Sequence, residues 1–551
     1  MYMQGLANFL DDFLGGLILI AYSLVVGSFL WSAVILRVWG RDCTVGTGVI
    51  RACIHILRGG AVALVVMMGL KLVIKGLILT SVLGEFPMLA YFSTVQFQAG
   101  LLRLLLAGGL IYLTPQMLQM PTHRALWNKA AVLAIPLIIS GAWLVHAVGR
   151  FEYREILMLT TVIHQLAAAV WFGGVAQLLA LWHQGHRDPD ALALWPQAIR
   201  RFATLGIGSV IALMVTGLPL AWTYIGTWEG FLGTGYGSLV GTKIIFFVIA
   251  LGFAWMNHTA GRRQDHLALT HRIPYYIEAE TFILIGVLFI AATLSSQPPS
   301  VDIQELTAQV SEVVEMFTPH TPRLSSPTHE QLLAGEAGRV AVVNKIPSLA
   351  ATEWSDYNHN ISGLFLTLMG LVAMLSYHQR FDWAKYWPIG FVGLSIFLFF
   401  RSDGETWPLG PIGFWESTFN NGEVFQHRIA TLLAFTLGVL EVRARSNPGT
   451  QKLRYLFPLL CAFGGILLLT HAHAEFELKS EYLIQSTHTS MGVLAVIMAS
   501  GRWLELRLAG FGSGYQRENE ENREGRIAGF IAIVAMFLIG NILLFYREPL
   551  Y

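Results

Sequence analysis

Apolar runs of roughly 20 residues recur along this chain of 551 residues, and short polar loops separate them. A helix of that length crosses about 30 Å of hydrocarbon, and in lipid a helix can satisfy all of its own backbone hydrogen bonds. Hydrophobic residues make up 54% of the chain and charged residues only 13%, a balance that excludes a soluble globular protein of this size. We therefore predict an all-α fold, a polytopic transmembrane helix bundle.

We predict about fourteen spans, eight in the first half of the chain and six in the second. The first eight cover residues 13–36, 56–80, 96–114, 130–149, 156–182, 203–225, 239–257 and 276–296. The other six cover residues 360–377, 386–400, 425–441, 455–470, 486–504 and 527–546. The longest polar stretch lies between the two sets. The predicted domains are thus an eight-span membrane domain (1–296), an extracytoplasmic linker or capping segment (297–357) and a six-span His-rich membrane domain (358–551).

Lys and Arg cluster in alternate loops, which the positive-inside rule assigns to the cytoplasm. The pattern begins with Arg37, Arg41 and Arg51 and continues through all fourteen spans. It predicts that both termini and residues 297–357 are extracytoplasmic. The first apolar run has no basic segment before it, so we expect a retained helix and not a cleaved signal peptide. The net charge of +1 indicates no nucleic-acid partner.

Three histidines, His471, His473 and His488, lie within eighteen residues at the junction of two predicted spans. In a regular helix His471 and His473 would diverge by about 200°, so they could not both reach one ion. If the preceding helix ends at Thr470, the extended His-Ala-His can turn both rings to one side. We therefore predict a helix end at Thr470 and a metal site formed by these histidines.

Further candidate ligands fall at the same predicted membrane level in the second half. They are His359, His427, Asp403, Glu405, Glu423 and Glu481. Glu423 and His427 are four residues apart and share one helix face. Imidazoles and carboxylates at one depth can bind a divalent metal or orient each other around it. The alternative is that each histidine only bonds loop backbone or lies at the headgroup level.

The first half offers His146 and His164, at the facing ends of two neighbouring predicted spans. Two such rings can share a metal, hold a haem on both axial faces, or only bond each other, and the sequence leaves these alternatives open. No Walker A, HExxH, CxxCH or GxSxG motif occurs. ATP-driven pumping is therefore unsupported, and we expect no enzymatic activity.

Several strings resemble the membrane domain of the copper resistance protein D (CopD) family. They include "RRFATLGIGSVIALMVTGLPLAW", "TGYGSLVGTKIIFFVIALGFAWMNH" and "EAETFILIGVLFIAATLSSQPPS". In the second half, "EVFQHRIATLL", "LLLTHAHA" and "STHTSMG" are similar to the C-terminal extension of the long form of this family. The resemblance places the family's polar positions at Tyr236, Gly237, Lys243, Asn257 and Glu280.

The resemblance implies a protein of the bacterial inner membrane that handles copper at the periplasmic face and imports it. It implies copper as the bound ion and a periplasmic copper chaperone as a partner. Two other functions stay open at this point. One is a b-type membrane electron carrier with haem on His146 and His164, and the other is an assembly factor that loads copper into a membrane enzyme.

Overall fold

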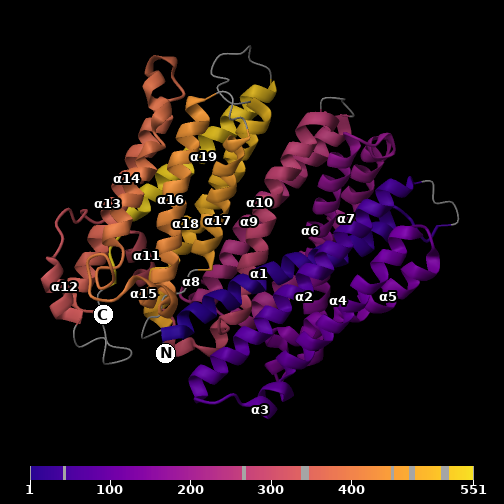
Figure 1. Cartoon of the computed structure of the whole chain (residues 1–551), viewed down its shortest axis with the longest axis horizontal. Helices are drawn as coiled ribbons and strands as arrows, with labels where there is room; N and C mark the ends of the chain where they lie inside the picture. The colour runs from indigo at the N-terminus through magenta and orange to yellow at the C-terminus, as the bar shows by residue number, and fades with distance from the viewer. Residues whose placement is uncertain are drawn as a thin grey trace. The chain divides into compact units, whose positions relative to one another are not determined.

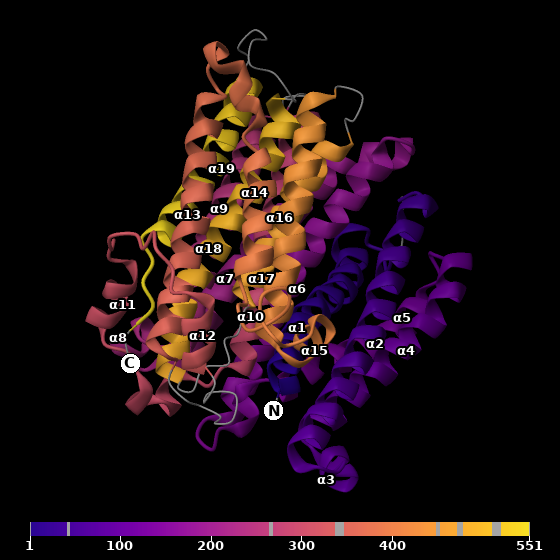
Figure 2. The same cartoon turned by 60° about the vertical axis from the view of Figure 1, so that its left-hand side comes forward.

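The computed structural model describes residues 2–40, 45–263, 268–336, 347–447, 452–470, 478–509 and 520–549 (Figures 1 and 2). These residues are almost entirely helical, and their one β feature is an isolated bridge between Thr406 and Ile412. The predicted all-α class is confirmed.

Each of the fourteen predicted spans overlaps a helix. These helices are α1 (Tyr2–Leu30), α2 (Thr47–Leu83), α4 (Val95–Gln119), α5 (Arg124–Ile139), α6 (Arg154–Gly185), α7 (Pro189–Ile225), α9 (Gly235–Arg263), α10 (Ile273–Ser296), α13 (Leu349–Leu375), α14 (Ile389–Arg401), α16 (Gly422–Ser446), α17 (Leu456–Leu469), α18 (Leu478–Leu504) and α19 (Glu520–Leu544). By length and apolarity, eleven segments of the described residues are able to cross a membrane. The helices α16, α17 and α18 are not among these eleven, since α17 is short and the other two are more polar.

Short helices fill the connections. The short α-helices are α3 (Met88–Ser93), α8 (Trp228–Leu232), α11 (Val310–Phe317), α12 (His329–Glu336) and α15 (Phe414–Asn420). The 3₁₀ and π segments are η1 (Trp31–Ile35), η2 (Ser140–Leu144), η3 (His146–Gly149), η4 (Ala268–Arg272), η5 (Ser300–Asp302), η6 (Gln304–Leu306), η7 (Gln379–Tyr386), η8 (Leu453–Tyr455) and η9 (Glu505–Ala509).

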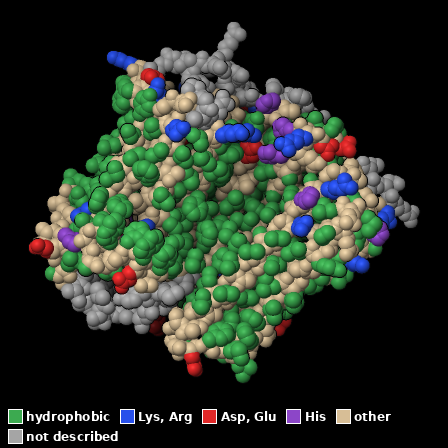
Figure 3. Space-filling view, viewed as in Figure 1, with side chains coloured by type: hydrophobic (Ala, Val, Ile, Leu, Met, Phe, Trp, Pro, Cys, Tyr) green, Lys and Arg blue, Asp and Glu red, His purple; other side chains and the backbone are tan. Residues whose placement is uncertain are grey.

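The helices form two compact units. Unit 1 contains residues 1–9, 227–246 and 298–551, and unit 2 contains residues 10–226 and 247–297. The division falls inside α9, so residues 227–246 belong with the later half of the chain. On the face shown in Figure 3, hydrophobic side chains cover broad areas of the helices, as lipid-facing helices require.

The predicted continuous span at 130–149 is wrong in its second half. The α-helix ends at Ile139, and the chain continues as the 3₁₀ segments η2 and η3. Pro136 has no N–H to donate to the preceding turn, which weakens the helix near this end. Gly141 then passes so close to α6 that a Cβ there would lie 2.1 Å from Gln165 Oε1. His146 consequently lies in a 3₁₀ turn and not at the end of an α-helix.

Glycines let the helices of each unit approach closely. In unit 2, a Cβ on Gly27 of α1 would lie 2.4 Å from Gly173 Cα of α6. In unit 1, a Cβ on Gly363 of α13 would lie 2.1 Å from the backbone nitrogen of Leu544 in α19. Small residues at such crossings bring backbones together, which is the main source of packing energy between helices in lipid.

The segment after α10 packs against other parts of unit 1. Ala308 and Met316 form a buried cluster with Tyr482 and Leu483 of α18 and with Tyr546 after α19. Residues 298–336 are called the cap from here on. The sequence left a linker and a capping segment open, and these contacts favour the capping interpretation for the described part.

Candidate metal site at one end of unit 1

Three of the predicted histidines come from three different helices of unit 1. His359 lies on α13, His427 on α16 and His488 on α18. The His359 and His488 rings are 5.8 Å apart, centroid to centroid, and nearly perpendicular. His427 lies within electrostatic range of both of these rings. The fold thus gathers histidines that are separated by 61 to 129 residues of sequence.

Each of the three rings has its Nδ1 atom bound to an oxygen that can only accept. Nδ1 of His359 is 2.9 Å from the Ser355 carbonyl oxygen, and Nδ1 of His488 is 3.0 Å from the Ile484 carbonyl oxygen. Nδ1 of His427 is 2.8 Å from Asp403 Oδ1. Because these oxygens accept, each Nδ1 carries a proton and donates it, so Nε2 is the ring atom that can bind a metal when the ring is neutral. This is the arrangement in which a histidine normally binds a metal.

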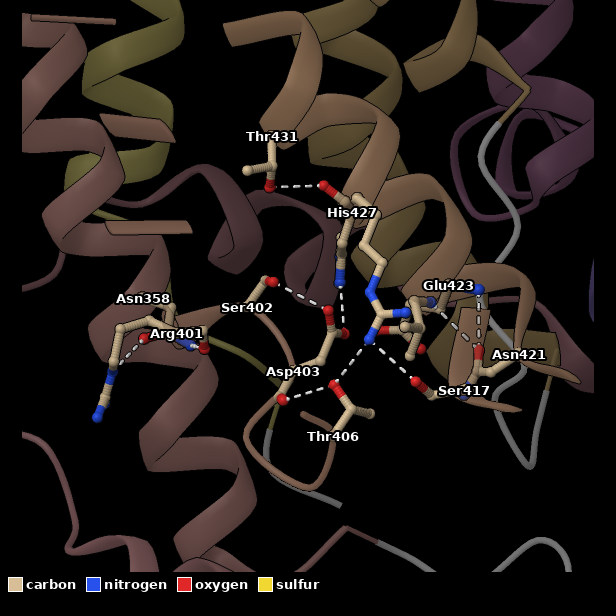
Figure 4. Close-up of polar contacts among 12 residues, drawn as sticks. Asn358, Arg401, Ser402, Asp403, Thr406, Ser417, Asn421, Glu423, His427 and Thr431 are labelled. Atoms are coloured by element: carbon tan, nitrogen blue, oxygen red, sulfur yellow. Dashed lines mark hydrogen bonds and ion pairs between the residues drawn. The ribbon is translucent and has the colours of Figure 1, made fainter. Parts of the chain in front are cut away.

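Asp403 and His427 form the best-defined pair of the site (Figure 4). Asp403 lies in the loop after α14, and its carboxylate also accepts from the Ser402 hydroxyl at 2.9 Å. Burial by itself would raise the pKa of the Asp403 carboxyl, but His427, Ser402 and Arg428 together hold it below its ordinary value. Asp403 therefore stays an anion that orients the His427 ring. About 31% of the His427 side chain is exposed, so the site is open to solvent there.

Arg428, next to His427 on α16, fixes the loop that carries Asp403. Its guanidinium donates to Ser417 Oγ at 2.9 Å and contacts the Phe414 carbonyl oxygen and Thr418 Oγ1. It also lies over the Phe414 ring, 4.1 Å from the centroid. The loop thus has one arginine at its centre, which limits how far Asp403 can move from His427.

The carboxylates predicted beside these histidines take different positions. Glu423 lies one turn before His427 on α16 and acts on it electrostatically, which confirms the shared helix face. Glu405 lies in the same loop as Asp403, and its backbone carbonyl accepts from the Ile412 amide at 3.2 Å. Glu481 is half-buried near the start of α18, two turns before His488.

His471 and His473 lie outside the described residues. The helix end predicted before them is confirmed, since α17 ends at Leu469 and Thr470 is its C-cap. Leu469 packs against Gly492, one turn after His488, where a Cβ on the glycine would lie 2.9 Å from Leu469 Cγ. The chain therefore leaves α17 at the level of His488. In the described part of the chain, no group of three or more His, Cys, Asp or Glu side chains is close enough to hold one ion.

The two predicted ligands of the first half have separate partners within unit 2. His146 Nε2 is 3.3 Å from the Leu294 carbonyl oxygen of α10. His164 Nδ1 is 2.9 Å from Thr216 Oγ1 of α7. The Thr216 hydroxyl donates its own proton to the Ala212 carbonyl oxygen at 2.5 Å, so His164 is the donor to Thr216. A site shared by the two rings stays a prediction.

Sequence reasoning missed Tyr546, whose ring centroid is 4.5 Å from that of His359. It follows α19, and nothing in the order of residues indicates that the chain returns to α13 there. The return is fixed by Asp356 of α13, which accepts from Arg547 Nη1 at 2.9 Å and from the Glu548 amide at 2.8 Å.

The fold and these buried polar groups define a polytopic all-α membrane protein with a histidine cluster at one end of a helical unit. Residues 196–294, from α7 into α10, match the family model described as Copper resistance protein D, which confirms the family resemblance. The chain is also 27% identical over 174 residues to a protein of Bacillus subtilis (strain 168) described as copper transport protein CutJ. The aligned region is 31% of this chain and 31% of that relative. No solved structure matches the chain.

Proposed function

We propose that this protein binds copper at the histidine end of unit 1 and carries it across the bacterial inner membrane. The observation that supports this most directly is that Nδ1 of His359, His427 and His488 each donates to an acceptor oxygen, which directs Nε2 of each ring as the metal-binding atom. Neutral imidazole binds copper well, and a carboxylate behind the ring raises its basicity. The description of the relative as a copper transport protein supports copper as the ion.

The proposed ligands are drawn from His359, His427, His488, His471 and His473, because no three of the described side chains are close enough to hold one ion by themselves. Asp403 is a supporting residue that orients His427, and Glu405, Glu423 and Glu481 supply negative charge around the site. His146 and His164 are proposed as a second station in unit 2. Copper is the cargo here, and no enzymatic reaction is proposed.

The proposed orientation has both termini and the cap on the extracytoplasmic side. Copper would then arrive from the periplasm, delivered by a copper chaperone, and enter beside the solvent-exposed part of His427. Labelling of a Ser325→Cys variant of the cap with an impermeant thiol reagent tests this orientation. Reaction in intact spheroplasts supports it, and reaction only after lysis contradicts it.

Copper titration of the purified protein tests the site. A His359→Ala, His488→Ala double variant is expected to lose at least about 100-fold in copper affinity, because it removes two direct ligands. The matched control is His378→Ala, which removes an exposed histidine beyond the other end of α13. Equal affinity in the double variant and the control would place the site elsewhere.

Copper uptake into proteoliposomes tests the second half of the proposal. Uptake by the wild type and the His378→Ala control, and none by the double variant, supports transport through this site. Copper binding without uptake would favour the loading of a partner enzyme. A visible haem spectrum in the purified protein would favour the electron-carrier alternative.

A further inference from the structure

Unit 2 contains a carboxylate deep inside its helices that the copper site does not use. Glu280 of α10 is only 2% exposed. Its Oε1 accepts from Trp171 Nε1 of α6 at 2.8 Å, and its Oε2 accepts from Asn257 Nδ2 of α9 at 3.3 Å. Both partners are neutral, so Glu280 is held by two hydrogen bonds and by no ion pair in the described residues.

Neither hydrogen-bond partner of Glu280 carries a charge that would keep it ionised. These partners lie on α6 and α9. On its own helix the nearest titratable group is Glu278, two residues earlier and on another helix face. An isolated anion at this depth is costly, and ionisable groups inside membrane spans are commonly parts of ion or proton pathways.

Asn257 supplies a second observation. Its Oδ1 atom is buried and has no hydrogen-bond partner in the described residues. An unsatisfied acceptor therefore lies directly beside a buried carboxylate, and neither Trp171 nor Asn257 supplies a positive charge. A half-turn of the amide exchanges Nδ2 with Oδ1, so Asn257 can donate to the Glu280 carboxylate or accept from its carboxylic acid. Trp171 donates to the other oxygen in either state.

We propose that Glu280 is a proton-binding site of unit 2, which takes up and releases one proton at Oε2 while Asn257 changes from donor to acceptor. The proton comes from a hydronium ion, whose O–H bond breaks to leave water, and release is the reverse step. Coupling of this proton to copper movement rests on the proposed function, but the proton site itself does not.

Infrared difference spectra of the purified full-length protein, recorded between about pH 5 and about pH 9, test the site. The wild type is expected to show a carboxylic-acid carbonyl band that Glu280→Gln lacks. The matched control, Glu278→Gln, removes another buried carboxylate of α10 and is expected to keep the band. Trp171→Phe is expected to shift it, because one hydrogen bond to the carboxyl group is lost. An unchanged band in Glu280→Gln would overturn the proposal.

Glu280→Asp keeps the test decisive if the glutamine variant does not fold, since a shorter acid in this site must shift the band. An unshifted band in that variant would also overturn the proposal. In proteoliposomes, copper uptake by the wild type is expected to move protons, and Glu280→Gln is expected to lose this proton movement. Uptake with wild-type proton movement in Glu280→Gln would overturn the coupling. If the wild type does not transport copper but shows the Glu280 band, the proposed function fails and the proton site stands.

Discussion

Two buried charged groups, one in each unit, are held differently. In unit 1, Glu441 of α16 is completely buried, and its Oε1 is 2.8 Å from Arg445 Nη2 and 2.9 Å from Arg502 Nη2. Arg502 also pairs with Glu505 at 2.5 Å. In unit 2, Arg103 of α4 is 3% exposed, and its described partners are the Ser140 hydroxyl at 2.9 Å and the Tyr22 ring.

This contrast separates two uses of charge inside a membrane protein. A network of opposite charges fixes its helices, because removing one member leaves the others buried and uncompensated. A group held only by neutral dipoles can lose its charge without stranding a partner. The Glu441 network is therefore suited to fix the helices of unit 1 around it, whereas Glu280 of unit 2, a carboxyl group held by the neutral Trp171 and Asn257, is suited to change its protonation.

The largest expected effect comes from breaking the network of unit 1. Glu441→Gln removes the buried negative charge that pairs with Arg445 and Arg502. We expect the free energy of unfolding to fall by about 3–5 kcal/mol. Glu280→Gln removes a buried carboxylate of unit 2 that has no cationic partner, and its loss should be much smaller. Folded protein remaining after heating in detergent, measured by size-exclusion chromatography, checks both. Equal losses in the two variants would remove the distinction between the units.

A smaller effect is expected at the copper site itself. Asp403→Asn keeps the shape of the side chain but removes the anion that accepts from His427 Nδ1. Loss of such a supporting carboxylate typically costs about 10–100-fold in metal affinity. Copper titration checks this, with Asp382→Asn as an exposed control that pairs only with Lys385 at 2.8 Å in the described residues. If both variants bind copper like the wild type, Asp403 does not support a ligand.

Asp403 also predicts how stability depends on pH. Its pKa is lower in the folded protein than its ordinary value, so its ionised form stabilises the fold. This contribution is fully present above the ordinary pKa of about 3.9 and is lost as the pH falls through the lower, folded value. Wild-type thermal stability should thus fall more steeply in this acid range than that of Asp403→Asn. Parallel curves for the two proteins would contradict the assignment.

The fourteen helices could be predicted from the sequence because each contains an apolar run whose length can be counted locally and compared with the thickness of the hydrocarbon layer. It also predicted the end of α17 and the shared face of Glu423 and His427, since both follow from helix geometry over a few residues. The Nδ1 partners of the histidines and the Trp171–Glu280 bond were not predictable, because they depend on which helices lie side by side. The position of Tyr546 depends on the same long-range packing.

The smallest expected effect concerns how the cap is attached to unit 1. Lys479 Nζ is 2.7 Å from Glu312 Oε1, and both side chains are about one-third exposed, at 31% and 36%. Burial opposes ionisation of Glu312, but the hydrogen bond and charge of Lys479 and the Gln309 amide together lower its pKa overall. Exposed pairs contribute about 0.2–1 kcal/mol, so Lys479→Ala should loosen the cap only slightly.

Met316→Ala, by contrast, leaves a hole in the buried cluster with Tyr482 and Tyr546, and hydrogen exchange of residues 310–317 should rise far more in this variant. Since Tyr546 also contacts the His359 ring, Met316→Ala is expected to weaken copper binding while Lys479→Ala leaves it unchanged. A larger increase in exchange for Lys479→Ala than for Met316→Ala would show that charge, and not apolar packing, holds the cap.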